Sequence, residues 1–164
     1  MLKPDFLLER VVEIAPEHLK KMGAKALIKD VDNTLSTHHG MELVEGLENW
    51  IEKMKEAGVP LLILSNSKEE RVKPFAKKIG LPFIALGLKP LPFGYIRAAK
   101  SLGLKVKETA LAGDQVFTDY LGARLSGAKI FLLKPIKLED KLSFKIRRYF
   151  ERKLLKKVKK GRFQ

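Results

Sequence analysis

The fold of this chain is decided by residues 26–35, which read ALIKDVDNTL, an apolar run that ends in Asp30 and Asp32 with one valine between them. A carboxylate buried inside a strand loses its hydration, which costs free energy unless a partner compensates. At the end of a strand, the carboxylates can point into a crevice, where a cation and a phosphorylated ligand would compensate. The stretch therefore predicts a buried strand over residues 24–29 and a nucleophile at Asp30. Lys29 interrupts the apolar run, and we expect its side chain on an exposed face.

Apolar patterns typical of strands and helices alternate along the rest of the chain. Further strands are expected at residues 59–64, 82–86, 109–112 and 129–133. Helices are expected at residues 16–23, 47–58, 72–80, 92–102 and 118–126, and over about 140–160. Strands separated by helices are joined by right-handed crossovers, which give a parallel sheet between two helical layers. We therefore predict a three-layer, Rossmann-like α/β fold with a central, mainly parallel, five-stranded sheet.

The length and composition fit one domain. The 164 residues are 45% hydrophobic, which is enough for a core and argues against general disorder. We expect one domain over residues 1–140, with residues 141–164 as its basic extension. The absence of cysteine excludes disulfides, zinc–thiolate sites and a cysteine nucleophile. The amino terminus has no apolar signal-peptide core, and no apolar run is long enough to span a bilayer. These features predict a cytoplasmic protein, either free or peripheral on the inner face of the membrane.

Polar side chains follow four of the five expected strands. In chain order they are Asp30 and Asp32, Ser65 and Asn66, Lys89, and Asp114 with Asp119. Because ligands bind at the carboxyl ends of parallel strands, we expect these side chains to meet at one edge of the sheet. Carboxylates bind a hard cation such as Mg²⁺, a lysine neutralises phosphate charge, and an aspartate can accept a phosphoryl group. The set therefore predicts phosphoryl transfer.

The same residues resemble the four ordered motifs of the haloacid dehalogenase superfamily. The motifs are DVDNT at residues 30–34, Ser65, Lys89 and GDQVFTD at residues 113–119. One such motif arises easily by chance, whereas four in the family's order, each at a strand end, are specific. The sequences DVDNTL and GDQVFTD, together with the segment 1–23, further resemble those of the IIIA-type phosphatases of the YqeG group. That group is similar to the mitochondrial phosphatidylglycerophosphate phosphatases. The resemblance implies a phosphoric monoester hydrolase.

The resemblance also implies catalytic roles. Asp30 would attack phosphorus and ligate Mg²⁺ through its other oxygen. Asp32 would protonate the leaving oxygen, activate the water that hydrolyses the phospho-aspartate, and bind the metal through its backbone carbonyl. Ser65 would donate a hydrogen bond to a phosphoryl oxygen, and Lys89 would neutralise charge on the phosphate and on Asp30. An acid at position 32 favours ester hydrolysis over dehalogenation, because a leaving alkoxide needs a proton.

The remaining residues of the expected site bind the metal and the substrate. The resemblance implies that Asp114 ligates the metal directly and that Asp119 is a further ligand or orients one. Thr34 and Asn66 are expected to contact the substrate together with Ser65 and Lys89.

The intervals between the motifs are too short for the lid domain that many relatives insert. A capless site suits a phosphate carried on a macromolecule or a membrane surface. We therefore expect a Mg²⁺-dependent phosphomonoesterase whose preferred substrate is a lipid headgroup phosphate such as phosphatidylglycerophosphate. Two alternatives stay open. One is a phosphatase of soluble sugar phosphates or nucleotides, and the other is a basic protein that binds RNA or the ribosome.

Positive charge is concentrated at the carboxyl terminus. The chain has 33 Lys and Arg against 19 Asp and Glu, and residues 141–164 contribute eleven of these basic residues against Glu151 alone. Basic residues around an apolar stripe at helical spacing are typical of a helix that binds an anionic membrane. RNA is the competing polyanion, although the tail has few aromatic residues and no RNA-binding motif. The residues expected to contact a membrane or another polyanion are Lys145, Arg147, Arg148, Arg152, Lys153, Lys156 and Lys157.

Overall fold

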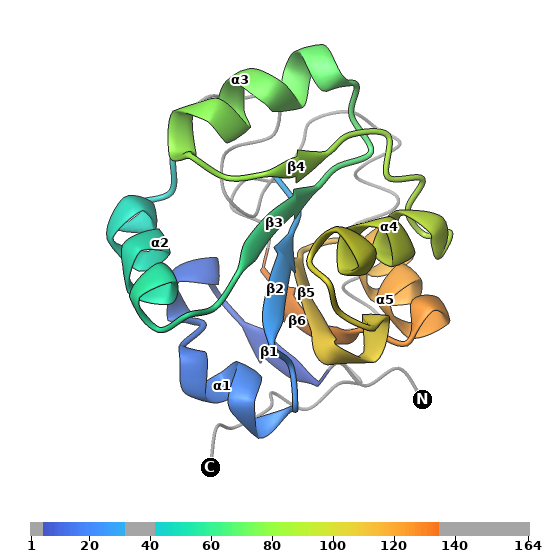
Figure 1. The fold of residues 1–164 in the computed structure, drawn as a ribbon, viewed down its shortest axis with the longest axis horizontal. Helices are drawn as coiled ribbons and strands as arrows, with labels where there is room; N and C mark the ends of the chain where they lie inside the picture. The colour runs from blue at the N-terminus through green and yellow to red at the C-terminus, as the bar shows by residue number, and fades with distance from the viewer. Residues whose placement is uncertain (1–4, 32–41, 135–164) are drawn as a thin grey trace.

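A computed structural model of the chain describes residues 5–31 and 42–134 (Figure 1). Its core is a six-stranded sheet of order β1-β6-β5-β2-β3-β4, in which every neighbouring pair is parallel. The strands are β1 Phe6–Leu8, β2 Ala26–Lys29, β3 Leu61–Leu64, β4 Phe83–Ile84, β5 Thr109–Gly113 and β6 Lys129–Leu133. The helices are α1 Pro16–Lys21, α2 Leu47–Glu56, α3 Glu69–Ile79, α4 Phe93–Ser101 and α5 Leu121–Ser126, with short turns η1 Val11–Glu13, η2 Val106–Glu108 and η3 Val116–Tyr120. Within these two described ranges, no helix is long and apolar enough to cross a membrane.

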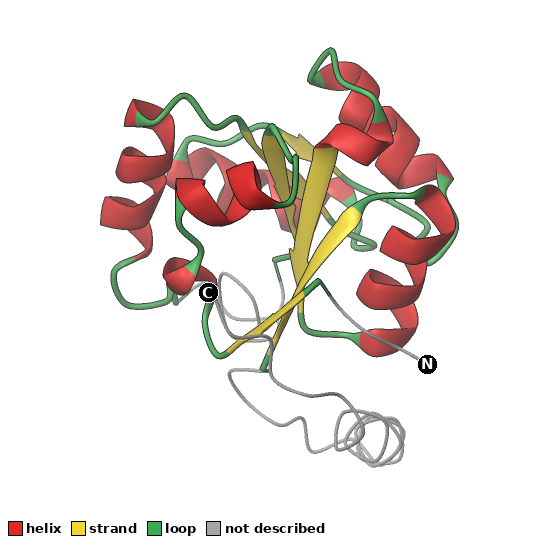
Figure 2. Ribbon diagram, turned by 90° about the horizontal axis from the view of Figure 1, so that it is seen from below, coloured by secondary structure: helices red, strands yellow, loops and turns green. Residues whose placement is uncertain are grey.

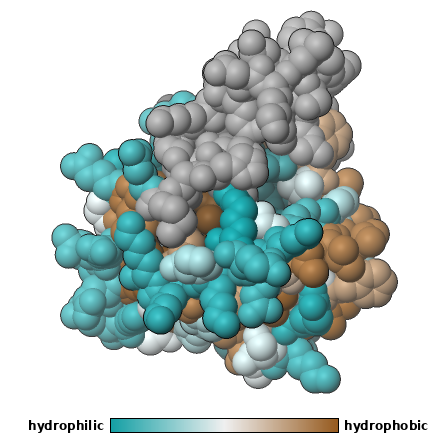
Figure 3. Space-filling model, turned by 90° about the horizontal axis from the view of Figure 1, so that it is seen from above, coloured by the Kyte–Doolittle hydropathy of each residue, from teal (hydrophilic) through white to brown (hydrophobic). Residues whose placement is uncertain are grey.

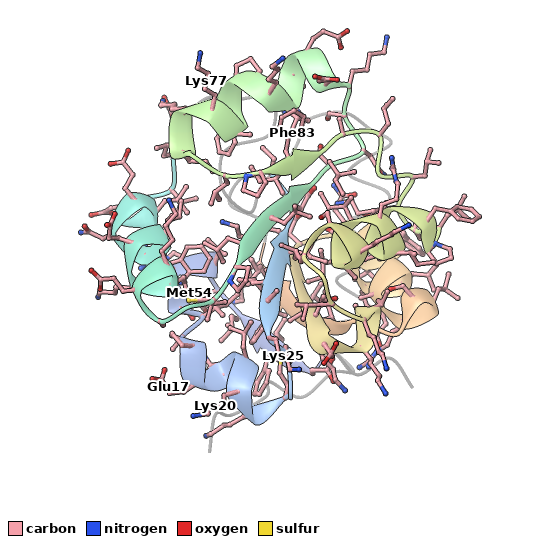
Figure 4. The ribbon with its side chains drawn as sticks, in the orientation of Figure 1. Glu17, Lys20, Lys25, Met54, Lys77 and Phe83 are labelled. Carbon is pink, nitrogen blue, oxygen red and sulfur yellow. The ribbon has the colours of Figure 1, made fainter. Side chains whose placement is uncertain are left out.

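Helices cover both faces of the sheet, as the second view shows (Figure 2). Successive residues of a strand point to opposite faces. Leu27 of β2 therefore joins the core beneath α1, α2 and α3, whereas Ile28 joins the core beneath α4 and α5. Met54 of α2 points into the first of these cores, while Glu17 and Lys20 on α1 point to solvent (Figure 4). The predicted three-layer, Rossmann-like α/β fold is confirmed.

The sheet has one strand more than the five expected. β1 pairs with β6 at the edge of the sheet, where Phe6 lies beside Phe131 with their rings stacked 5.4 Å apart. Asp5 anchors the same edge, because its Oδ2 accepts a hydrogen bond of 2.8 Å from the backbone N–H of Ile130. Three residues are too few for a strand pattern to stand out, and the partner strand is far away in sequence. The helix expected over 140–160, the extension 141–164 and its boundary lie outside the described residues.

The segment after β5 begins with a wider helical turn than the α-helix expected over residues 118–126. The carbonyl of Gln115 accepts hydrogen bonds from the backbone N–H groups of both Asp119 (2.9 Å) and Tyr120 (3.1 Å). The second bond spans five residues, which is the pattern of a π-helix, and η3 has that form before α5 continues. Asp119 lies inside this turn and is completely buried.

The expectation that Lys29 lies on an exposed face is wrong. Its side chain is fully buried beneath α2, with Nζ 4.8 Å from the centre of the Trp50 ring. The ring is itself fixed by a hydrogen bond of 2.7 Å from its Nε1 to the carbonyl of Ile14. Within residues 5–31 and 42–134, Lys29 Nζ has no hydrogen-bond partner. Burial, and to a smaller extent the charge of Lys55, lowers the pKa of Lys29 to about 7.

Replacing this lysine should stabilise the protein. Between pH 7 and 10.5 the unfolded chain holds a proton on Lys29 that the folded protein has released, so the wild type gains stability as the pH rises through this window. We expect Lys29→Met to raise the free energy of unfolding by on the order of 2 to 4 kcal/mol at pH 7. The gain should shrink toward pH 10, as followed by urea unfolding. The control Lys53→Met, at an exposed position of α2, should change the free energy of unfolding by less than about 0.5 kcal/mol. A Lys29→Met protein less stable than the wild type at pH 7 would contradict this account.

Candidate active site

Three buried carboxylates meet at the carboxyl edge of the sheet. Asp30 follows β2 and Asp114 follows the neighbouring strand β5, while Asp119 reaches the same place from η3. Asp30 is held to β5 by a hydrogen bond of 3.0 Å from its backbone N–H to the carbonyl of Ala112. One oxygen of each carboxylate lies within 4.8 Å of the other two. The edge that was predicted from the strand ends therefore brings these acids together.

Lys89 bridges two of the three carboxylates. Its Nζ donates hydrogen bonds of 2.7 Å to Oδ1 of Asp30 and of 2.7 Å to Oδ1 of Asp119, and the side chains of all three residues are buried. Burial alone would lower the pKa of Lys89, but the charges of Asp119 and Asp30 outweigh it and raise this pKa above its ordinary value. The lysine therefore stays protonated. Three carboxylates and one ammonium leave a formal charge of −2 (−3 + 1), which matches a divalent cation.

Asn66 positions Lys89 through the backbone. Its side-chain amide donates a hydrogen bond of 2.9 Å to the carbonyl of Lys89, and its Oδ1 accepts one of 2.7 Å from the N–H of Lys89. Both ends of the amide are thus used to hold the loop that carries the lysine. A contact between Asn66 and substrate stays a prediction, whereas this positioning role was not foreseen from the sequence.

Ser65 lies at the same edge, at the end of β3. Lys29 at the end of β2 pairs with Ile63, one residue before the end of β3, so the two strands end within one residue of each other. The Ser65 hydroxyl is buried and accepts a hydrogen bond of 3.1 Å from the N–H of Ser67. Because this bond uses the oxygen as acceptor, the hydroxyl proton can be donated to a phosphoryl oxygen. Asp32 and Thr34 lie outside the described residues.

Two further residues of the GDQVFTD motif shape the site in ways that were not predicted from the sequence. Gly113 ends β5, and a Cβ there would lie 2.4 Å from Cγ of Asp119, so only glycine lets that carboxylate approach. The glycine of the GD motif was the signal that could have indicated this. Gln115 donates its backbone N–H to Oδ2 of Asp119 over 3.1 Å and so orients the carboxylate. The sequence could not indicate this bond, because it depends on the π-turn.

The donor set fits a hard divalent cation. Asp30, Asp114 and Asp119 offer only carboxylate oxygens, which are the ligands that Mg²⁺ prefers, and no soft ligand lies among them. Lys89 takes one oxygen of Asp30 and one of Asp119, while Gln115 contacts the second oxygen of Asp119. Both oxygens of Asp119 are therefore engaged by groups of the protein.

The chain belongs to the haloacid dehalogenase-like hydrolases, because residues 3–127 match that family. It is 36% identical over 162 residues to Probable phosphatase YqeG of Bacillus subtilis (strain 168). This alignment covers 98% of this chain and 94% of that protein. The enzyme class expected from the motifs, a phosphoric monoester hydrolase, is confirmed by these two similarities. The chain is also 26% identical over 156 residues to Phosphatidylglycerophosphate phosphatase 1, chloroplastic/mitochondrial, of Arabidopsis thaliana. That match covers 88% of this chain but only 45% of the plant protein.

Solved structures share the fold. A HAD family hydrolase from Deinococcus radiodurans R1, with bound phosphate and sodium, matches with a TM-score of 0.59 at 17% identity, over 66% of this chain and 80% of that chain. The cobalt-bound deoxy-D-mannose-octulosonate 8-phosphate phosphatase (YrbI) of Haemophilus influenzae matches with a TM-score of 0.56 at 18% identity, over 78% of this chain and 77% of that chain. At these identities the likeness concerns the fold alone.

Proposed function

We propose that this protein is a Mg²⁺-dependent phosphomonoesterase that works through a phosphorylated Asp30. The observation that carries the proposal is the buried bridge from Lys89 to Asp30 and Asp119 beside Asp114. Structural ion pairs seldom leave three carboxylates around one ammonium, because the excess negative charge is expensive to bury. A phosphatase site uses that excess to bind a cation.

Each proposed step is assigned to a residue of the chain. Mg²⁺ held by Asp30, Asp114 and the Asp32 carbonyl would neutralise phosphate charge and polarise the phosphorus. A carboxylate oxygen of Asp30 attacks phosphorus, and the bond to the ester oxygen breaks as Asp32 gives that oxygen its proton. Asp32 then takes a proton from water, whose oxygen attacks the phosphorus of phospho-Asp30 and releases inorganic phosphate. Ser65 and Lys89 bind phosphoryl oxygens throughout.

The proposed substrate is a phosphate on a lipid headgroup, such as phosphatidylglycerophosphate. The similarity to the plant protein of that name supports this choice, although the chain spans less than half of it. The intervals between Asp30, Ser65 and Lys89 are occupied by α2, β3, α3 and β4, which leaves no helical lid over the site among the described residues. A site of this kind admits a headgroup at the surface of a bilayer.

Metal removal and a substrate panel test this proposal. We expect EDTA to abolish phosphate release and Mg²⁺ to restore it, because the site carries a charge of −2 that a divalent cation compensates. With Mg²⁺ present, kcat/KM should be at least about 10-fold higher for phosphatidylglycerophosphate in vesicles than for sugar phosphates or nucleotides. Higher kcat/KM on a soluble ester would reject the lipid substrate. Full activity in EDTA would reject the metal.

A further inference from the structure

Exposed apolar side chains gather on one helical layer of the protein. All eight large hydrophobic residues that are exposed in the described part of the chain lie between Leu86 and Leu125. On the β4–α4 connection and α4 they are Leu86, Leu88, Leu91, Phe93 and Ile96. On η3 and α5 they are Phe117, Leu121 and Leu125. We call these eight residues the apolar face. Figure 3 shows brown surface gathered at the right, the side on which Figure 1 places α4 and α5.

The two halves of the apolar face belong to one surface, because α4 packs directly against α5. Tyr95 of α4 lies so close to Gly122 of α5 that a Cβ at Gly122 would be 2.3 Å from the tyrosine oxygen. The same oxygen donates a hydrogen bond of 3.1 Å to the carbonyl of Thr118 in η3. Single exposed hydrophobic residues are ordinary on a protein surface, but a contiguous group marks a site of interaction.

The backbone also holds two of these leucines in unfavourable conformations. Leu86 and Leu88 have φ angles of +48° and +55°, in the left-handed region that residues with a Cβ rarely adopt. Both side chains are more than half exposed, so burial does not compensate for the strain. Backbone strain at exposed residues is concentrated at functional sites, including binding surfaces.

The β4–α4 connection and α4 carry only positive charge. Residues 85–101 contain Lys89, Arg97 and Lys100 and no Asp or Glu. Arg97 and Lys100 project from α4 beside the apolar residues, and neither forms an ion pair with another residue of the described part of the chain. Glu108 lies in η2, before β5 begins, and therefore at the opposite edge of the sheet from the catalytic residues. An apolar surface with cationic neighbours complements an anionic bilayer, which offers acyl chains beneath a layer of phosphates.

The apolar face also reaches the rim of the active site. Leu88 directly precedes Lys89, and Phe117 lies between Asp114 and Asp119 in the chain. A surface bound at the apolar face would therefore lie beside the entrance to the carboxylates. A substrate headgroup in that surface could reach Asp30 without leaving the bilayer.

We infer that the apolar face is a docking surface for an anionic lipid bilayer, into which its leucines and phenylalanines insert while Arg97 and Lys100 contact lipid phosphates. This inference rests on the proposed function only for the identity of the hydrolysed substrate, because docking to a bilayer requires no catalytic turnover. A protein partner fits the charges less well, because protein surfaces present both signs and would leave these cations unmatched.

Vesicle binding by the full chain tests the apolar contribution. We expect the wild type to cosediment with vesicles of phosphatidylcholine and phosphatidylglycerol. The variant Phe93→Gln/Ile96→Gln/Leu125→Gln should partition at least about 10-fold more weakly, because its inserting side chains are gone. Its hydrolysis of p-nitrophenyl phosphate should stay within about 2-fold of wild type, because none of the three residues belongs to the catalytic machinery.

A matched pair of charge variants tests the electrostatic contribution. Arg97→Gln/Lys100→Gln and Lys53→Gln/Lys77→Gln each remove two positive charges, but the second pair lies on α2 and α3, where Lys77 points to solvent (Figure 4). Since charges act over roughly 8 Å at physiological salt, only the first variant should lose at least about 10-fold in partitioning. The second should stay within about 2-fold of wild type.

The outcomes separate docking from chemistry. Partitioning of the apolar variant at the wild-type level, or no binding by the wild type, overturns the docking surface. The docking surface is also overturned if light scattering shows that the wild type is a dimer and the apolar variant a monomer, because a second copy of the chain would then cover the apolar face. If the predicted losses occur but no lipid phosphate is hydrolysed, docking stands and the proposed substrate fails.

Discussion

Asp30→Asn should reduce phosphatase turnover by at least about 10³-fold, because an amide cannot form the acyl phosphate that the proposed mechanism requires. The substitution preserves the shape of the side chain, and its amide oxygen can still accept the 2.7 Å hydrogen bond from Lys89. The buried site should therefore keep its structure. Initial rates with p-nitrophenyl phosphate, together with circular dichroism of the same samples, measure both effects.

The control is Glu48→Gln, which also turns a carboxylate into an amide but on the exposed first turn of α2. It should keep wild-type turnover within about 2-fold, since surface substitutions away from special features have small effects. An Asp30→Asn protein that turns over at a rate similar to this control would contradict the assignment of Asp30 as the nucleophile.

The second large effect is expected from Lys89→Met. Methionine fills a similar volume but leaves Asp30 and Asp119 buried without the ammonium that bridges them. Breaking a buried ion pair in this way typically costs about 3–5 kcal/mol. We expect a loss of that size in the free energy of unfolding without added metal, measured by urea unfolding, and loss of turnover as well.

The dependence on pH follows from the raised pKa of Lys89, which results from Asp119 and Asp30 despite burial. The contribution of a group whose pKa is higher in the folded state is fully present below its unfolded pKa of 10.5. The loss caused by Lys89→Met should therefore be equal at pH 7 and pH 9.

Lys25→Met is the matched control for Lys89→Met. Lys25 forms an ion pair with Glu108 at the same distance of 2.7 Å, but its side chain is 65% exposed. Solvent screens such a pair, so its removal should change stability by less than about 1 kcal/mol. If the two methionine variants lose the same stability, the buried bridge does not have the energetic role assigned to it.

The catalytic edge could be predicted from the sequence because parallel strands place their carboxyl ends together. Asp30 and Asp114 each follow a strand, and the structure brings them within ligating distance of one cation. Asp119 was expected nearby, but the π-turn that aims it depends on how the chain leaves β5. Strand periodicity does not carry such information.

Two features depended on contacts between distant segments and were missed or predicted wrongly. β1 exists because β6 offers it an edge, and three residues show no pattern of their own. Lys29 was expected to be exposed because an ammonium inside a core is unfavourable. The structure buries it against Trp50, and only the position of α2 over β2 decides that.

Asn66 illustrates the limit of assigning roles from motifs. Its place after β3 predicts a substrate contact, which stays a prediction, but gave no sign that its amide is bound at both ends to the backbone of Lys89. The bonds join two loops at different strand ends, so spacing along the chain could not indicate them. Asn66 is thus a positioning residue for the lysine that bridges Asp30 and Asp119.

The measurement that tests the central claim most directly is the capture of the phosphoenzyme. Wild-type protein is mixed with Mg²⁺ and a phosphomonoester, quenched in acid during turnover and reduced with borohydride, which converts an aspartyl phosphate to homoserine. Peptide mass spectrometry then identifies the converted residue. The proposed mechanism predicts homoserine at position 30, absent in Asp30→Asn and absent without substrate. Conversion at another aspartate, or turnover with no converted residue, would contradict it.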